Sequence, residues 1–164
     1  MPDIHTRTQD RLRVGTDEIT FRVTSGQTGG ALLAAEVRMP PGGGPPALHR
    51  HDPDEVYRLE RGRLAIYVED DAGQVRRLVA GPSDVVHIAG GRAHTIRNES
   101  DADALAYVVF TPGTAMEGFV RAAARLAGDG PPAAADVLAL AERHGIRMAG
   151  PVPADDSISA HAIH

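Results

Sequence analysis

Short apolar segments separated by turn-forming residues dominate the first 110 residues of the chain. Apolar runs that alternate with polar residues, or that stay apolar for a few positions, predict β-strands. We predict strands at residues 19–24, 31–39, 55–60, 63–69, 74–79, 84–88, 94–97 and 104–110. Many short strands with Gly and Pro turns and no helices between them indicate an antiparallel all-β sandwich or barrel.

The pattern changes after residue 112, where apolar residues take helical spacing. Thr114 and Glu117 have the spacing of a helix capping box, so we predict a helix over 115–127. A second helix is predicted over about 133–144, and Gly145 is suited to cap its end. These helices are expected either to close the barrel mouth or to pack closely on its outer wall.

The same pattern divides the chain into four segments. We predict an N-terminal extension at 1–18, a β-barrel at 19–112, a helical extension at 113–148 and a flexible tail at 149–164. The tail is predicted to be mobile because its apolar residues have no periodicity.

Composition excludes several classes of chemistry. The 164 residues suffice for one domain, all 17 basic residues are arginine, and cysteine is absent. Lysine Schiff bases, thiol nucleophiles and zinc–thiolate sites are therefore excluded. A net charge of −5 and an aromatic content of 4% argue against a nucleic-acid partner. Without a secretory signal or a membrane-length apolar stretch, we expect a cytoplasmic protein that has no membrane partner.

Histidine and glutamate cluster in one stretch of the sequence. His49 and His51 point to the same face of an extended backbone, and Glu55 returns to that face after the bend at residues 52–53. The glycines before His94 allow a sharp turn that aims this histidine at the other three groups. These four side chains are therefore our candidate metal ligands.

Three imidazoles and one carboxylate suit a transition metal better than Ca²⁺ or Mg²⁺, which prefer oxygen ligands. We expect one divalent ion, iron first, with Ni, Co, Mn, Cu or Zn as the alternatives. Four protein ligands on an octahedral ion leave two positions for water, O2 or a chelating substrate, which is the requirement for catalysis at the metal.

Other residues near this stretch have weaker signals. Tyr57 shares the parity of Glu55, so we expect it to line the barrel interior and to be a catalytic or substrate-contacting group beside Glu55. Tyr107 and Phe110 have opposite parity, so only one of them should face the interior. His87 is expected on the surface. No catalytic role is assigned to the remaining histidines, His5, His144, His161 and His164.

The histidine and glutamate spacing resembles the two motifs of the cupin superfamily, over about residues 19–112. The first motif matches at His49, His51, Glu55 and Gly62, and the second at Gly91, His94 and Asn98. The chain departs from the second motif in its turns, at Ser83, Ala89 and Ala93. Together with the two C-terminal helices, the pattern is most similar to single-domain, quercetin-dioxygenase-like cupins. The resemblance implies a jelly-roll β-barrel whose internal metal is held by His49, His51, Glu55 and His94, and a homodimer.

Three functions remain open at this point. The first is an oxygenase that brings a chelating enol or phenol and O2 to the metal. The second is a non-redox cyclase, isomerase or decarboxylase, in which Glu55 or Tyr57 handles protons. The third is a small-molecule-binding cupin without catalysis. Sensor cupins often carry a DNA-binding domain, and only about 18 residues precede the first predicted strand, which disfavours this third option.

Overall fold

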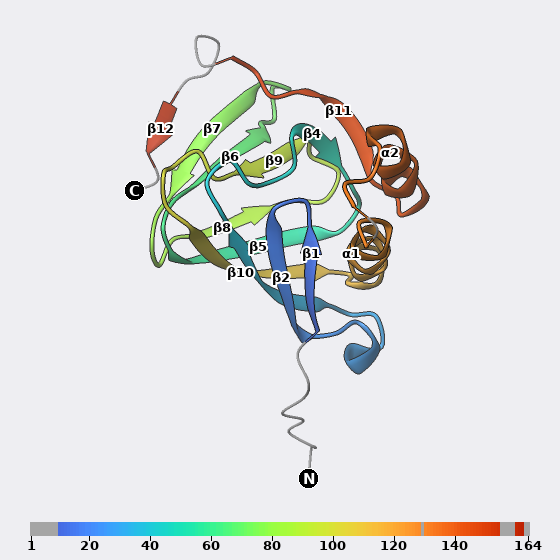
Figure 1. The fold of residues 1–164 in the computed structure, drawn as a ribbon. Helices are drawn as coiled ribbons and strands as arrows, with labels where there is room; N and C mark the ends of the chain where they lie inside the picture. The colour runs from blue at the N-terminus through green and yellow to red at the C-terminus, as the bar shows by residue number, and fades with distance from the viewer. Residues whose placement is uncertain (1–9, 129, 155–159, 163–164) are drawn as a thin grey trace.

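The computed structural model describes residues 10–128 and 130–154, together with the backbone of a short strand at Ala160–Ala162. Two six-stranded sheets pack against each other (Figure 1). The first contains, in spatial order, β1 (Arg11–Val14), β2 (Asp17–Val23), β3 (Leu33–Met39), β10 (Ala104–Thr111), β5 (Asp54–Arg61) and β8 (Val85–Ile88). The second contains β11 (Arg147–Pro151), β4 (Ala47–Arg50), β9 (His94–Arg97), β6 (Leu64–Glu69), β7 (Val75–Ala80) and β12 (Ala160–Ala162).

Alternation of side chains along the strands builds the core. In β10, which lies between β3 and β5, every second residue from Ala104 to Phe110 is buried. A buried cluster joins Leu59 of the first sheet with Ile66 and Ile96 of the second. The interior of the molecule is therefore the space between the two sheets, as the period-two pattern predicts.

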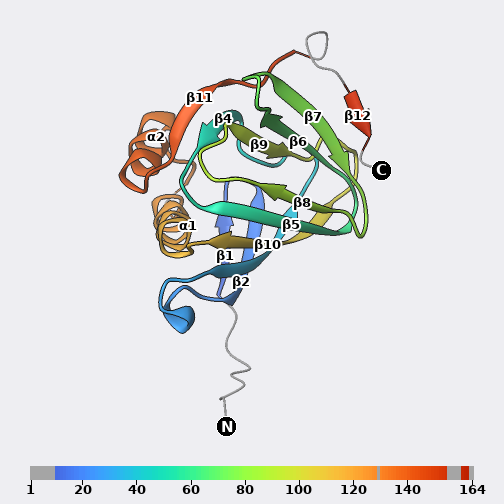
Figure 2. The same ribbon diagram turned by 180° about the vertical axis from the view of Figure 1, so that it is seen from behind.

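Two helices follow the sheets, α1 (Thr114–Leu126) and α2 (Ala134–Arg143), and both lie on one side of the barrel (Figures 1 and 2). The inner face of α1 buries Met116, Val120 and Ala123, and the first two of these pack in a cluster with Phe21 of β2. The helices therefore extend the hydrophobic core at that side of the molecule.

The start of α1 corrects the prediction of a capping box. The N-cap residue is Gly113, and no side chain caps the helix. Glu117 instead accepts hydrogen bonds from the backbone N–H and the hydroxyl of Ser25, both at 2.6 Å, and pairs with Arg121 at 3.0 Å. These contacts hold Glu117 away from the helix N-terminus. At the end of α2, Gly145 has the predicted positive φ of +77°.

Both ends of the chain add strands that the sequence pattern did not indicate. Strand β1 falls within the segment predicted as an extension and pairs with β2. Residues 149–151, predicted to be part of a flexible tail, belong to β11, which pairs with β4. Further along, β12 pairs in parallel with β7 on the side opposite the helices (Figures 1 and 2).

The fold agrees with the jelly-roll prediction: mostly β, in two sheets that are antiparallel apart from the short strand β12, with two short helices after the main strands. Within the described part of the chain, neither helix has the length and apolar composition that crossing a bilayer would require.

Candidate metal centre

Strand pairing brings His49 and His94 together, although they are distant in the sequence. His49 lies in β4 directly opposite His94 in the neighbouring strand β9. His51 is two residues further along, so its side chain returns to the same face as that of His49. Glu55 comes from β5 in the other sheet. The four predicted ligands therefore converge from both sheets, and we call them the histidine centre.

The three imidazoles are close enough to bind one ion. One ligand nitrogen from each of His49, His51 and His94 lies within 4.8 Å of the other two. Ring centroids are 4.5 Å apart for His49 and His94, and 4.9 Å apart for His51 and His94. His51 and His94 are each only 2% exposed, so bulk water does not separate these groups.

Each imidazole is oriented by the backbone next to it. The Nδ1 atoms of His49, His51 and His94 lie 3.2, 3.0 and 2.9 Å from carbonyl oxygens two residues away in the chain. A ring nitrogen that donates to a carbonyl carries the proton, which leaves the lone pair of a neutral imidazole on Nε2. This arrangement is typical of metal-binding histidines, because it points the basic nitrogens inward.

Glu55 completes the centre. Its Oε1 atom lies 2.8 Å from Nε2 of His51, and its Oε2 atom lies 3.5 Å from Nε2 of His94. Glu55 Oε2 and His94 Nε2 are buried without a hydrogen-bond partner among the described residues. Lone pairs on nitrogen and on a carboxylate repel each other unless a proton or a cation lies between them. The donor set therefore fits a bound metal ion.

Electrostatics keep Glu55 ionised and His49 neutral, which are the charge states in which these two groups bind a metal ion. Burial lowers the pKa of His49 to about 4, and the charge of His94 adds to the effect, so His49 is neutral at neutral pH. Burial opposes ionisation of Glu55, but its interactions with the imidazoles of His51 and His94 outweigh burial and lower the pKa to about 2. Burial likewise opposes protonation of His94, but Glu55 outweighs it and raises this pKa. Glu55 thus attracts positive charge into the centre.

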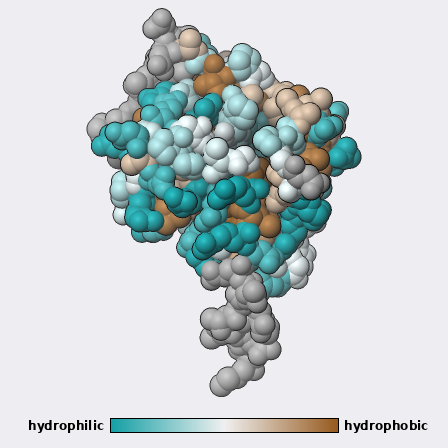
Figure 3. Space-filling view, viewed as in Figure 1, coloured by the Kyte–Doolittle hydropathy of each residue, from teal (hydrophilic) through white to brown (hydrophobic). Residues whose placement is uncertain are grey.

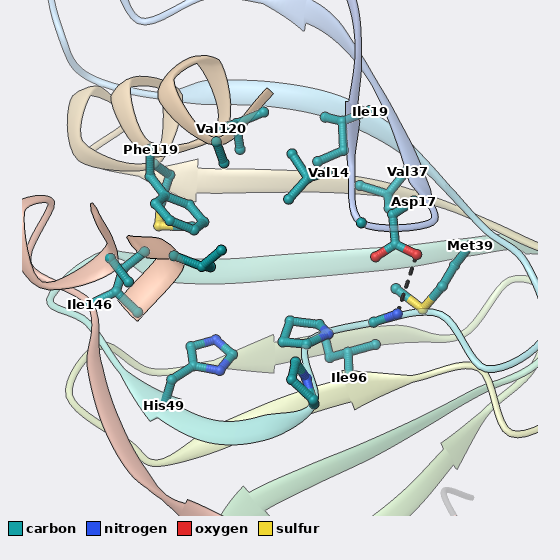
Figure 4. Close-up of a pocket in the computed structure, with 18 of the residues that line it drawn as sticks. Val14, Asp17, Ile19, Val37, Met39, His49, Ile96, Phe119, Val120 and Ile146 are labelled. Carbon is teal, nitrogen blue, oxygen red and sulfur yellow. Dashed lines mark hydrogen bonds between the residues drawn. The ribbon is translucent and has the colours of Figure 1, made fainter. Parts of the chain in front are cut away.

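The histidine centre opens on a cavity of about 380 Å³ between the sheets, which we call the central cavity (Figure 4). Val37, Met39 and Phe110 contribute to its walls from the first sheet, and Phe119 and Val120 contribute from α1. This volume is in the range of small-molecule sites. Both helices line the cavity, so of the two predicted positions they take the one at the mouth of the barrel and not the one on its outer wall.

The central cavity reaches the surface beside the helices. Leu126, Leu138 and Met148 line it and are also 38%, 48% and 47% exposed. Figure 3 shows apolar residues on the side of the molecule where these helices lie. An apolar rim of this kind allows an uncharged molecule to enter with little loss of hydration.

Tyr57 lies where its parity predicted, in the wall of the cavity beside Glu55. Burial raises the pKa of Tyr57 well above its usual value, and the negative charges of Glu55 and Asp17 add to the shift. The hydroxyl group is therefore protonated throughout the physiological range. Of the two aromatics in β10, Phe110 rather than Tyr107 lines the cavity.

The other described histidines lie outside the centre. His87 is on the surface, as predicted, where its Nε2 pairs with Asp54 at 2.8 Å. His144 caps the end of α2. Outside the described side chains are His5, His161 and His164.

Asp17 is a cavity residue that the sequence analysis missed. It begins β2 after the turn at Gly15 and Thr16, within the segment predicted as an extension, and its carboxyl group lines the central cavity. Locally the sequence has the appearance of a solvent-exposed turn. The only signal is the glycine run at residues 42–44, since a loop without side chains permits close approach to another segment.

Comparisons with known proteins agree with this geometry. Residues 35–110 match the model of the cupin domain family. No curated protein matches the sequence at a significant level.

Three solved structures with similar folds differ in their named activities. An oxalate oxidase is 22% identical with a TM-score of 0.50, over 77% of this chain and 65% of that chain. A mutant of Bacillus subtilis oxalate decarboxylase is 19% identical with a TM-score of 0.52, over 67% of this chain and 31% of that chain. A sugar phosphate isomerase of the cupin superfamily from Silicibacter pomeroyi is 22% identical with a TM-score of 0.51, over 67% of this chain and 75% of that chain.

Identities this low establish the fold and not the reaction, and the chain spans only part of the two oxalate enzymes. The three neighbours also differ in their chemistry. Taken with the paired sheets, they lead to one conclusion: the chain has the jelly-roll fold of the cupins, and residues 35–110 are similar in sequence to the cupin domain.

Proposed function

We propose that this protein is a metal-dependent enzyme that acts on a small, neutral organic molecule. The observation that carries the proposal is the position of the histidine centre, whose inward-facing Nε2 atoms and unpartnered Glu55 oxygen adjoin the central cavity. A closed structural metal site would have no such adjoining space for a substrate.

The bound metal and the side chains beside it divide the chemistry. A divalent transition metal ion held by His49, His51, His94 and Glu55 would supply Lewis acidity and, if it is iron, electron transfer with O2. Glu55 remains ionised, so a carboxylate oxygen is available to accept a proton from an enol or phenol whose acidity the metal would increase. Tyr57 remains protonated and donates a hydrogen bond to a substrate oxygen that gains negative charge.

The walls of the cavity argue for a neutral substrate. Among the described residues that line it, none is arginine, and the sequence contains no lysine. A phosphate or a dicarboxylate would leave its charges unpaired there, apart from the charge that the metal neutralises. Enols, phenols and β-dicarbonyl compounds satisfy the metal with their oxygens and the walls with their carbon skeletons.

Within this class, the first candidate is an oxygenase similar to the quercetin dioxygenases. The motif resemblance supports it, and so does a ligand set that would leave two positions at the metal, enough for O2 and one oxygen atom of the substrate. The second candidate is a non-redox cyclase, isomerase or decarboxylase, which the same Glu55 and Tyr57 would serve. A binding protein without turnover is the third.

The test begins with protein purified without added metal, whose metal content is measured directly. Samples loaded with Fe²⁺, Ni²⁺, Co²⁺, Mn²⁺ or Zn²⁺ are then given flavonols and β-dicarbonyl compounds, and O2 consumption is followed with substrate loss. Coupled loss of O2 and substrate supports the oxygenase. Substrate loss under strict anaerobiosis supports the non-redox enzyme, and stoichiometric binding without turnover overturns the enzymatic proposal.

A further inference from the structure

The central cavity has a second polar feature, on the side away from His49. Asp17 lies across the cavity from His49 with its carboxyl group turned into the gap (Figure 4). The cavity walls near Asp17 are apolar, with Val14, Ile19 and Val37 among the residues that form them (Figure 4). A molecule that fills the cavity therefore meets the histidine centre at one end and a carboxyl group at the other.

The carboxyl group of Asp17 is poorly satisfied by the protein. Its one hydrogen bond among the described residues comes from the Gly44 N–H, at a long 3.2 Å. The group is partly buried, and burial raises its pKa to about 6, against the lowering effect of that hydrogen bond and of the charge of Arg97. A carboxylate can accept about four hydrogen bonds, so most of its capacity is available to a ligand.

The loop opposite Asp17 is shaped for this contact. A Cβ atom on Gly43 would lie 2.5 Å from Asp17 Oδ1, and one on Gly44 would lie 2.0 Å from the carbonyl oxygen of Ile96. Gly44 also has a φ of +101°, which residues with side chains rarely adopt. Only a loop without side chains fits between Asp17 and β9, so the glycines hold Asp17 at the edge of the cavity.

We propose that Asp17 is a specificity-determining residue that accepts a hydrogen bond from a hydroxyl group on the end of the substrate that lies away from the metal. The inference rests on the proposed function and adds a substrate class to it: a mainly apolar, neutral molecule with metal-binding oxygens at one end and a hydroxyl donor at the other. A hydroxyl suits the site better than an ammonium group, because the apolar walls offer nothing to replace the hydration of a cation.

Four β-dicarbonyl probes test this arrangement. Benzoylacetone offers the metal-binding oxygens alone, and its para-hydroxyphenyl and meta-hydroxyphenyl analogues add a distal donor at two positions. Calorimetric titration of the Zn²⁺-loaded protein should show at least one hydroxylated probe binding about tenfold more tightly than benzoylacetone, since hydrogen bonds to charged groups contribute about that much. The para-methoxyphenyl analogue adds volume without a donor and should gain nothing.

Two variants separate hydrogen bonding from packing. Asp17→Leu removes the acceptor at similar volume and should abolish the preference for the hydroxylated probe. Asp17→Asn keeps a neutral acceptor and should still bind that probe about threefold more tightly than benzoylacetone. Glu18→Gln is the matched control, because Glu18 pairs with Arg11 at 3.5 Å and does not line the cavity, and it should keep the full preference.

The outcomes also separate this inference from the proposed function. Zinc content, measured on the same samples, should be equal in the wild-type protein and all three variants. If the wild-type protein retains zinc but binds the probes equally, or binds none, the role of Asp17 is overturned while the metal centre stands. An equal drop in affinity for every probe in Asp17→Leu would show a structural residue and would also overturn the inference. Loss of zinc from the wild-type protein would contradict the metal centre instead.

Discussion

Two buried polar regions of this molecule differ in how completely they are satisfied. Asn98 is fully buried, and every part of its amide group has a partner. Its Nδ2 atom donates to the carbonyl oxygens of Met39 and Ala102 at 2.8 and 2.7 Å, and its Oδ1 atom accepts from the backbone and the hydroxyl of Ser100 at 3.0 and 2.7 Å. The group thereby ties the end of β3 to the loop that follows β9.

The histidine centre is equally buried but incompletely satisfied. Its Nδ1 atoms all have backbone partners, yet Glu55 Oε2 and His94 Nε2 have none in the part of the chain that the structure describes. Because an unpaired buried polar atom destabilises the fold, its presence at a point where four ligands meet indicates a role outside folding. The contrast shows that the completeness of hydrogen bonding, more than burial, distinguishes a structural polar group from a functional one.

The largest expected effect is on metal binding. His94→Ala and His51→Ala should each weaken metal retention by more than about 100-fold, because each removes a predicted ligand from the centre. Metal content after dialysis against a weak chelator measures this, and circular dichroism should show that both variants keep the β fold.

The surface residue His87 provides the control for that experiment. His87→Ala removes an exposed ion pair with Asp54 and should leave metal content unchanged. Retention of metal by both ligand variants, or its loss in His87→Ala, would contradict the assignment of the centre.

Replacing the satisfied amide should affect stability and not metal binding. Asn98→Ala removes the amide donor to the buried carbonyl oxygens of Met39 and Ala102 and the acceptor of the Ser100 N–H, so the free energy of unfolding should fall by about 2–3 kcal/mol. Urea denaturation measures the change. Metal content per folded molecule should equal that of the wild-type protein. A loss of metal at unchanged stability would contradict the assignment of a purely structural role to Asn98.

The smallest expected effect concerns Asp17. With one hydrogen bond, from the Gly44 N–H, its side chain is less completely satisfied than Asn98 but is not without a partner. Its pKa of about 6 lies above the ordinary value of 3.8, so its protonated form favours the folded state. That contribution is complete below about pH 4 and is lost as the pH rises through 6. Asp17→Asn should therefore be more stable than the wild-type protein at pH 8, by about 1 kcal/mol after allowance for partial exposure.

Urea denaturation of both proteins at pH 4, 6 and 8 checks this prediction. Other titrating groups are common to the two proteins and cancel in the difference. The stability gap should shrink as the pH falls toward 4, and a gap that is constant with pH would show that the environment of Asp17 does not raise its pKa.

Local spacing in the sequence predicts much of the fold and three of the candidate metal ligands, which are His49, His51 and Glu55. The alternation in β10 is visible in the sequence, and His49 and His51 share a face because they are two residues apart. The same local reasoning misled at Glu117, whose spacing from Thr114 fits a capping box. There a contact with Ser25, 92 positions away in the chain, outweighs the local interaction.

The chain's own pattern of polar and apolar residues was enough to specify a β-sandwich type of fold and the residue types of a metal centre, because burial in strands repeats every two residues. The three-dimensional packing alone decided which polar atoms lack partners, that α1 and α2 form a wall of the cavity, and that Asp17 faces it. Those features depend on contacts such as that of Asp17 with Gly44, 27 positions away, where the environment of a carboxyl group is set by segments that do not neighbour it in sequence.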